Sequence, residues 1–281
     1  MRPSPDRVAC GSARSGQARL LRQWSPWSPW LTAGRVSILA IGAAAAVAMA
    51  AVPAAAQGPP GRAVLTLNGG GQSAGPGLSD HFEFERNVET ATVDVRYPAK
   101  PIVLADGGLG IRVWKNLGVG VAVSYAAGDG TAEVDARIPH PLQFGQPRTV
   151  EGEQDAITHS ETGVHVQLQY SIPMSSRVML VLSGGPSRLN VEQDLVTDVL
   201  YDEEYPFDEA TFRSAPTRRS KASATGFNAG ADLQWMFGRN FGLGAMVRFI
   251  RGSVELTTDD DRRIAVRAGG LQAGGGLRIG F

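Results

Sequence analysis

The nine residues Leu117-Gly-Val-Gly-Val-Ala-Val-Ser-Tyr125 decide the fold class of this chain. Large apolar side chains stand at the odd positions, and glycine, alanine or serine stands at the even positions. A period of two with one apolar face and one small or polar face predicts a β-strand. Nine residues is also enough for a tilted strand to cross a bilayer, which takes roughly 9–11 residues. Soluble proteins contain such strands too, so the recurrence of the pattern carries the inference.

The same alternation recurs along the chain, with short and long connections in turn. The short ones are Trp114–Asn116, Ser171–Ser176 and Gly238–Asn240; the polar stretches 81–97, 127–157 and 194–220 are predicted loops, and Asp259–Asp261 is a predicted turn. An even number of strands with alternately short and long connections is typical of outer-membrane barrels. A ten-strand count stays open if Phe82–Glu85 and Thr90–Tyr97 also cross the membrane. The eight predicted strands are Ala63–Gly70, Ile102–Val113, Leu117–Tyr125, Val164–Tyr170, Val178–Leu182, Phe227–Trp235, Phe241–Phe249 and Leu271–Phe281.

Residues 1–56 have the composition of an export signal. Six arginines and one aspartate precede an alanine-rich apolar run, Val36–Val52, which leads to small residues ending at Ala56. This order predicts a secretory signal peptide cleaved after Ala56, with 57–281 as the barrel domain; a membrane anchor helix is the alternative. Cleavage removes the one cysteine, Cys10, which excludes a disulfide framework and a cysteine-bound metal in the mature chain. It leaves 21 basic and 26 acidic residues.

The small or polar face of these strands predicts a polar lumen. An unpaired buried charge is very costly, so the inward arginines must be paired or hydrated. We expect Asp232 to bridge Arg248 or a neighbouring arginine, either as the gate of a narrow water path or as a closed plug. An eight-stranded barrel leaves little more room than side chains fill, which favours the plug. The predicted lumen network is Arg112, His165, Gln167, Gln169, Asn228, Asp232, Gln234, Arg248, Gln272 and Arg278, joined by the inward-facing Thr66, Asn68 and Ser124.

Aromatic residues gather near the expected strand ends, as the two interfacial girdles of a membrane barrel do. Trp114 has the height of one girdle but the parity of an inward residue. A soluble, lipocalin-like barrel is the alternative, and it would turn the apolar face inward. The girdles, the export signal and the last residue favour the membrane barrel. Near the short turns lie Tyr170, Trp235, Phe237, Phe241 and Phe281, and near the other end lie Tyr125, Phe227 and Phe249.

The chain ends in Gly276-Leu-Arg-Ile-Gly-Phe281, with an aromatic last residue and apolar residues at alternate preceding positions. With this ending, residues 57–281 resemble the OmpA-like and OmpX-like family of small outer-membrane barrels. The resemblance implies an all-β fold: an eight-stranded antiparallel up-and-down transmembrane β-barrel with short periplasmic turns and long extracellular loops. It also implies that Leu277, Ile279 and Phe281 form the signal read by the barrel-assembly machinery. The peptidoglycan-binding domain of full-length OmpA is not expected here.

Together these features predict a monomeric outer-membrane protein of the porin family, in contact with lipid and lipopolysaccharide. Its expected role is structural or narrowly porin-like, with a closed or weakly conducting interior. It is not expected to be an enzyme or to bind a cofactor, a metal or nucleic acid, and its four histidines lack metal-ligand spacing.

Two alternatives stay open. One is an adhesin or ligand-binding barrel acting through its loops. There the acidic stretch Tyr201–Glu209 would hold divalent cations, and the basic residues Arg213, Arg218, Arg219 and Lys221 would meet lipopolysaccharide phosphates. The other, more remote alternative is a lipid A or protein hydrolase at the rim. It would use His159, which has Ser160, Asp155 and Glu153 nearby in the sequence.

Overall fold

The computed structural model describes residues 62–75, 77–238, 240–257 and 263–281, all within one compact unit, Val47–Phe281. The predicted signal peptide, 1–56, and the predicted turn Asp259–Asp261 lie outside the described residues. In the part of the chain that is described, no helix is long and apolar enough to cross a membrane.

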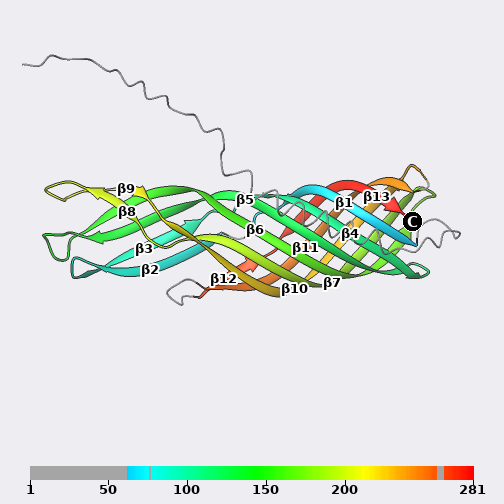
Figure 1. Ribbon diagram of the computed structural model, residues 1–281, viewed down its shortest axis with the longest axis horizontal. Coiled ribbons are helices and arrows are strands. Elements are labelled where there is room, and N and C mark those ends of the chain that lie inside the picture. Colours follow the sequence, from blue (N-terminus) through cyan, green and yellow to red (C-terminus); the bar gives the residue numbers. More distant parts are fainter. Residues whose placement is uncertain (1–61, 76, 239, 258–262) are drawn as a thin grey trace, which may run out of the picture. The chain divides into compact units, whose positions relative to one another are not determined.

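Eight strands of the described chain form a closed antiparallel ring (Figure 1). Hydrogen bonds link them in the order β5-β4-β1-β13-β11-β10-β7-β6, and β6 pairs with β5 to close the circle. The first and last strands of the ring pair along their whole length, from Val64 opposite Gly280 to Gln72 opposite Gln272. The predicted eight-stranded barrel is therefore confirmed. The ring strands are β1 (Ala63–Gln72), β4 (Ile102–Trp114), β5 (Leu117–Pro139), β6 (Pro147–Pro173), β7 (Val178–Val196), β10 (Thr217–Met236), β11 (Phe241–Thr257) and β13 (Leu271–Gly280).

The ring strands differ greatly in length. At 23, 27 and 20 residues, β5, β6 and β10 are at least twice as long as β1 and β13, which have 10 residues each. A membrane crossing uses roughly 9–11 residues, so the rest of each long strand continues beyond the membrane. The sequence-based prediction of loops over 127–157 and 194–220 is wrong for most of these residues. Charged side chains interrupt the apolar face there, but the period of two continues.

Five further strands build on the projecting ends of the long ones. β2 (Leu78–Arg86) and β3 (Glu89–Tyr97) form a hairpin, and β3 pairs with β5 from Thr92 opposite Arg137 to Arg96 opposite Glu133. β12 (Arg263–Ala268) pairs with the end of β11. β8 (Leu200–Glu203) and β9 (Ala210–Ser214) form a separate two-stranded sheet. The prediction of a loop over 81–97 is therefore wrong, because these residues form the β2–β3 hairpin. The hairpin adds no strand to the ring, so the ten-strand alternative does not apply.

The unit has two parts, a lower barrel and an outer extension. The lower barrel is the ring of residues 63–72, 102–127, 161–189, 224–251 and 271–281, which ends in the short turns. The outer extension consists of β2, β3, β8, β9 and β12 with residues 129–160, 190–222 and 252–257. Since outer-membrane barrels turn their short connections toward the periplasm, the outer extension lies on the extracellular side.

The outer extension has an apolar core of its own. The inward side chains of β5 are Ala132, Val134, Ala136 and Ile138, each at most 3% exposed, and they pack against Val93 and Val95 of β3. Val150, Ile157, Leu195, Val196 and Leu256 complete the walls of this core. A bulge at Ala156, whose φ is +62°, moves the inward side of β6 from even positions before it to odd positions after it, and so keeps Val150 and Ile157 inside.

Candidate functional site

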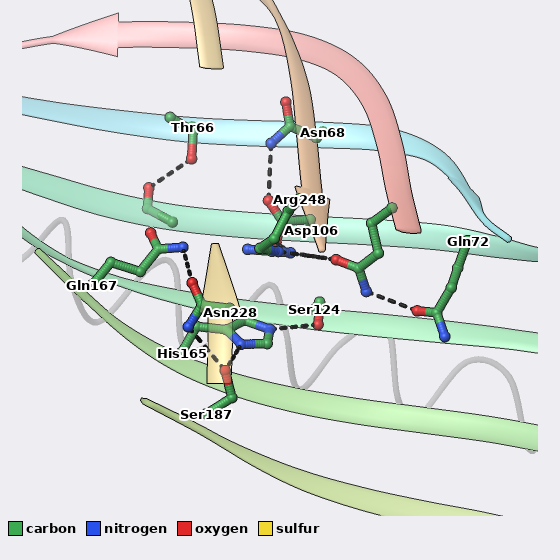
Figure 2. Close-up of polar contacts among 12 residues, drawn as sticks. Thr66, Asn68, Gln72, Asp106, Ser124, His165, Gln167, Ser187, Asn228 and Arg248 are labelled. Atoms are coloured by element: carbon green, nitrogen blue, oxygen red, sulfur yellow. Dashed lines mark hydrogen bonds and ion pairs between the residues drawn. The ribbon is translucent and has the colours of Figure 1, made fainter. Parts of the chain in front are cut away.

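An unbroken chain of hydrogen-bonded polar side chains crosses the lumen of the lower barrel, and Figure 2 shows its part from Asn68 to Gln72. Arg278 donates to Asn68 Oδ1 at 2.7 Å, and Asn68 donates to Asp106 at 2.9 Å. Arg248 binds the other oxygen of Asp106 and also donates from its Nε to Gln272 Oε1 at 3.0 Å. Residues that are far apart in the sequence therefore meet at the centre of the barrel.

The chain continues toward the outer extension through amides and a carboxylate. Gln272 donates to Gln72 at 2.8 Å, and Gln72 donates to Glu161 at 2.9 Å. Glu161 also accepts a hydrogen bond from the backbone N–H of Gly269 at 3.0 Å. Its second oxygen contacts His159 Nε2 at 3.1 Å. The polar contacts thus run from one end of the lumen to its outer rim.

Two ion pairs hold the buried charges of the lumen. Arg278 is fully buried, and its guanidinium binds both carboxylate oxygens of Asp232, from Nε at 2.9 Å and from the NH2 group. Arg248 and Asp106 form the second pair, with side chains 4% and 3% exposed. Each cation therefore has one anion, as burial of charge requires. Of the two expected partners for Asp232, the structure places the neighbouring arginine, Arg278, against it.

A second polar cluster lies against the opposite wall. Both ring nitrogens of His165 contact serine hydroxyls, Nε2 with Ser124 at 2.9 Å and Nδ1 with Ser187 at 2.8 Å. Asn228 donates to the same Ser187 oxygen at 2.9 Å and accepts from Gln167 at 2.9 Å. His165 is fully buried and fully partnered, which is the geometry of a structural histidine.

Glycine makes room for these large polar groups. A Cβ added to Gly244 would lie 2.5 Å from the Nε atom of Arg278, so the guanidinium occupies the space that a side chain would take. The remaining space between the two clusters is a cavity of about 70 Å³, lined by Asn68, Asp106, Gln169, Asp232 and Arg248 among others. A cavity of this size holds a few water molecules.

The sequence misplaced or missed several members of this network. Arg112 has inward parity but is exposed at the mouth, where it lies 3.6 Å from the sulfur of Met179. Gln234, by contrast, lies in the lumen as predicted, where it is buried and donates to Asp232 at 2.8 Å. The residues that sequence reasoning left out are Asp106, Gln72, Glu161 and Ser187. Asp106 stands at an even position of β4, like Arg112, so the alternation of the strand was sufficient to predict that it faces the lumen.

The aromatic residues predicted for the interfaces stand on the outside of the lower barrel. Trp235, Phe237, Phe241 and Phe281 are each at least half exposed, and the rings of Trp235 and Phe237 lie 6.3 Å apart. Tyr170 and Phe249 are exposed as well, and Tyr125 is half-buried. An irregularity in the pairing of β4 between Arg112 and Trp114 turns Trp114 outward, 64% exposed, which explains its parity.

The residues of the hydrolase alternative do not form a catalytic arrangement. His159 Nδ1 contacts Gln193 Oε1 at 2.6 Å, and its Nε2 contacts Glu161, so both ring nitrogens face oxygen atoms. Among the described residues, no hydrogen bond joins His159 to Ser160, Asp155 or Glu153.

Three of the four basic residues proposed to meet lipopolysaccharide pair with acids of the chain itself. Arg219 pairs with Asp194 at 2.9 Å, Lys221 with Glu192 at 2.8 Å and Arg213 with Asp202 at 3.1 Å. In the described part of the chain, no three histidine, cysteine, aspartate or glutamate residues are grouped so that they could hold a metal ion.

The comparisons with known proteins agree with this architecture. Residues 42–278 match the outer membrane protein beta-barrel domain family, so the chain belongs to a family of outer-membrane barrels. None of the curated proteins matches the chain.

Solved structures with similar folds share little sequence with it. OprG from Pseudomonas aeruginosa is 10% identical with a TM-score of 0.44, over 80% of this chain and 98% of that one. Neisserial surface protein A is 13% identical with a TM-score of 0.40, over 80% of this chain and 100% of that one. The outer membrane protease OmpT from Escherichia coli is 8% identical with a TM-score of 0.45, over 78% of this chain and 96% of that one. We draw no functional inference from likenesses this distant.

Proposed function

We propose that this protein is a structural barrel of the outer membrane whose lumen is closed, or conducts only narrowly. The observation that carries the proposal is the unbroken hydrogen-bonded chain from Arg278 through Asp106 and Arg248 to Glu161. A conducting path must break or bypass these contacts. Breaking them leaves buried charges without partners, which is costly in a narrow lumen.

Single-channel recording in planar bilayers tests this proposal, using full-length protein purified from membranes. We expect the wild type to give no conductance steps, or only small ones. Asp106→Ala and Asp232→Ala each remove the anion of one ion pair, and we expect either change to raise conductance. Asp129→Ala is the control, since this exposed carboxylate lies outside the network. Large steps from the wild type would overturn the closed lumen and indicate a porin.

We also propose that β13 carries the signal for assembly. Leu277 and Phe281 point outward, 49% and 50% exposed, and alternate with the buried Arg278 and Gly280. An outward apolar edge of this kind is accessible to the assembly machinery before the ring closes. Phe281→Ala should lower the yield of folded barrel in the outer membrane, measured by the heat-dependent shift in gel mobility. An unchanged yield would argue against this role.

A further inference from the structure

Three turns of the outer extension present large apolar side chains to water. We call the turns 87–88, 140–146 and 204–209 the outer tip. Val88 is 92% exposed, Phe144 79%, Tyr205 78% and Leu142 66%. The hairpins β2–β3, β5–β6 and β8–β9 end together at the extremity opposite the C-terminus (Figure 1).

Polar contacts join the three turns into one surface. Asn87 donates to the backbone oxygen of Pro139 at 3.1 Å, and the N–H of Gly145 donates to Glu89 at 2.8 Å. The buried Arg148 donates to the backbone oxygens of Pro139 and Phe207, at 3.1 and 3.0 Å. Arg148 also pairs with Glu203 at 2.7 Å. The turns that carry the exposed apolar side chains are therefore held together by hydrogen bonds and an ion pair.

The membrane of the same barrel does not cover these side chains. From Tyr125 at the outer girdle to Pro139 at the base of the turn, β5 runs 14 residues further, or roughly 45 Å of strand. Even with a barrel tilt, this distance places the tip well beyond the lipid interface. The fold does not require large apolar residues at water-exposed turns, where polar residues are the usual choice.

Part of the negative charge around the tip has no ion-pair partner among the described residues. Residues 201–209 contain five exposed acids and no base. Asp202 pairs with Arg213, Glu203 pairs with Arg148, and Asp208 lies 3.7 Å from His140, while Glu204 and Glu209 have no ion pair with a described residue.

On the sheet below, Asp135 lies opposite both Asp94 and Glu151, and Glu133 lies between Glu153 on one side and Arg96 on the other. Like charges in directly opposite positions destabilise a sheet. Glu133, Asp135, Glu151 and Glu153 form no ion pair with any described residue.

The far wall of the outer extension provides an internal comparison. On β7 and β10, Asp194 stands opposite Arg219 and Glu192 stands opposite Lys221, and both pairs form salt bridges. The chain therefore pairs both of these outward acids on the far wall, whereas Asp135, Glu151 and Glu153 on the wall that leads to the tip have no such partner among the described residues. Positive charge on a partner would complement these acids.

We propose that the outer tip is a docking site for a polypeptide segment in which aromatic or branched apolar side chains alternate with lysine or arginine. Val88, Leu142, Phe144 and Tyr205 supply the apolar contact. The acids of 201–209 and of the β3–β5–β6 face pair with the cations. An extended peptide repeats its side chains every two residues at about 7 Å, which matches the spacing of Glu133 and Asp135 along β5. This role concerns the outer surface and does not depend on whether the lumen conducts.

Fluorescence anisotropy with labelled heptapeptides tests the proposal on the full-length protein in nanodiscs. The probe peptide alternates lysine with phenylalanine and leucine. One comparison peptide carries glutamate in place of lysine, and another carries glycine in place of the apolar residues. We expect the probe to bind at least tenfold more tightly than either comparison peptide. We also expect its affinity to fall as salt rises.

Variants separate the two contributions. The double change Leu142→Ser and Phe144→Ser should weaken binding of the probe at least tenfold. Glu204→Gln with Glu209→Gln should weaken binding and reduce its salt dependence. Met174→Ser is the matched control, because Met174 is equally exposed in a turn at the opposite end, at 64%. Gel mobility checks that each variant is folded.

Three results would overturn the proposal. The probe fails to bind, the lysine–glycine peptide binds as well as the probe, or the Leu142/Phe144 variant binds like the Met174 control. The second result would mean that only diffuse charge attraction acts at this surface. The conductance of the same samples is measured separately, so failure here does not bear on the closed lumen.

Discussion

The two halves of β5 have opposite chemistry although they belong to one continuous strand. From Leu117 to Tyr125 the outward side chains are apolar and the inward ones are small or polar. From Ala132 to Ile138 the inward side chains are apolar and the outward ones are Glu133, Asp135 and Arg137. The parity of inward and outward positions is the same throughout, so the reversal is one of composition alone.

This difference shows what surrounds each half. The lower barrel meets hydrocarbon outside and needs its buried polar groups satisfied within the lumen. The outer extension meets water outside and is stabilised by an apolar core, like a soluble protein. The surroundings of β5 change from hydrocarbon to water near Gly128. There the chain is rich in glycine, and the pairing of β5 with β6 shifts by one residue.

The largest effect should come from breaking a lumen ion pair. Asp232→Ala leaves the fully buried Arg278 without its anion, and removing one partner of a buried pair costs about 3–5 kcal/mol. Urea unfolding in lipid vesicles, followed by tryptophan fluorescence, measures this loss of stability. Asp129→Ala, on the exposed surface, should change stability by less than about 0.5 kcal/mol. Equal effects of the two changes would contradict a lumen held together by charge pairing.

Matched valine truncations should separate the two surroundings of β5. Val134→Ala leaves a cavity in the core of the outer extension, and we expect a loss of about 2–3 kcal/mol. Val119→Ala faces lipid, whose chains fill the gap, so we expect only the transfer loss of about 1 kcal/mol. The same urea titration compares the two variants. A larger loss at Val119 would mean that the assignment of the two surroundings is wrong.

Replacing a glycine by alanine should have different effects in the lower barrel and in the outer extension. Gly244→Ala places a Cβ against the Arg278 guanidinium and should cost about 1–2 kcal/mol of barrel stability. Gly152→Ala places a Cβ 2.2 Å from the ring of Phe212 in β9. We expect this change to loosen the β8–β9 hairpin while the barrel stays folded. Limited proteolysis at 200–214 and gel mobility distinguish the local effect from the global one.

The smallest expected effect is on the pKa of His81, on the water-facing side of the outer extension. A hydrogen bond to Asp94, at 2.9 Å, raises the pKa of His81 above its ordinary value, despite an opposing contribution from burial. Because the folded pKa lies above the unfolded one, the stabilisation is complete below about pH 6.5 and is lost as the pH rises through the folded pKa. NMR titration of His81 should show this raised pKa. Asp94→Asn should return it toward the ordinary value, while Glu85→Gln should not; an unshifted Asp94→Asn variant would contradict the pairing.

Local pattern was enough to predict the ring. Alternation with a period of two depends only on neighbours in the sequence, so it identified a segment in each of the eight ring strands, along with the short turns and the outward aromatic residues. The same pattern was present in Ala132, Val134, Ala136 and Ile138, but their charged neighbours led to the prediction of a loop. The prediction assumed one environment for the whole chain. A strand that leaves the membrane keeps its period and exchanges the chemistry of its two faces.

The sequence by itself therefore predicted an export signal and determined an eight-stranded antiparallel barrel with a polar inside. Only the tertiary structure decided which charges meet. Arg248 and Asp106 are 142 residues apart, and Arg278 and Asp232 are 46 apart. Parity shows that such residues share the lumen, but their contact depends on register, tilt and ring closure. Those follow from the hydrogen bonds of all eight strands at once, which no single stretch of sequence contains.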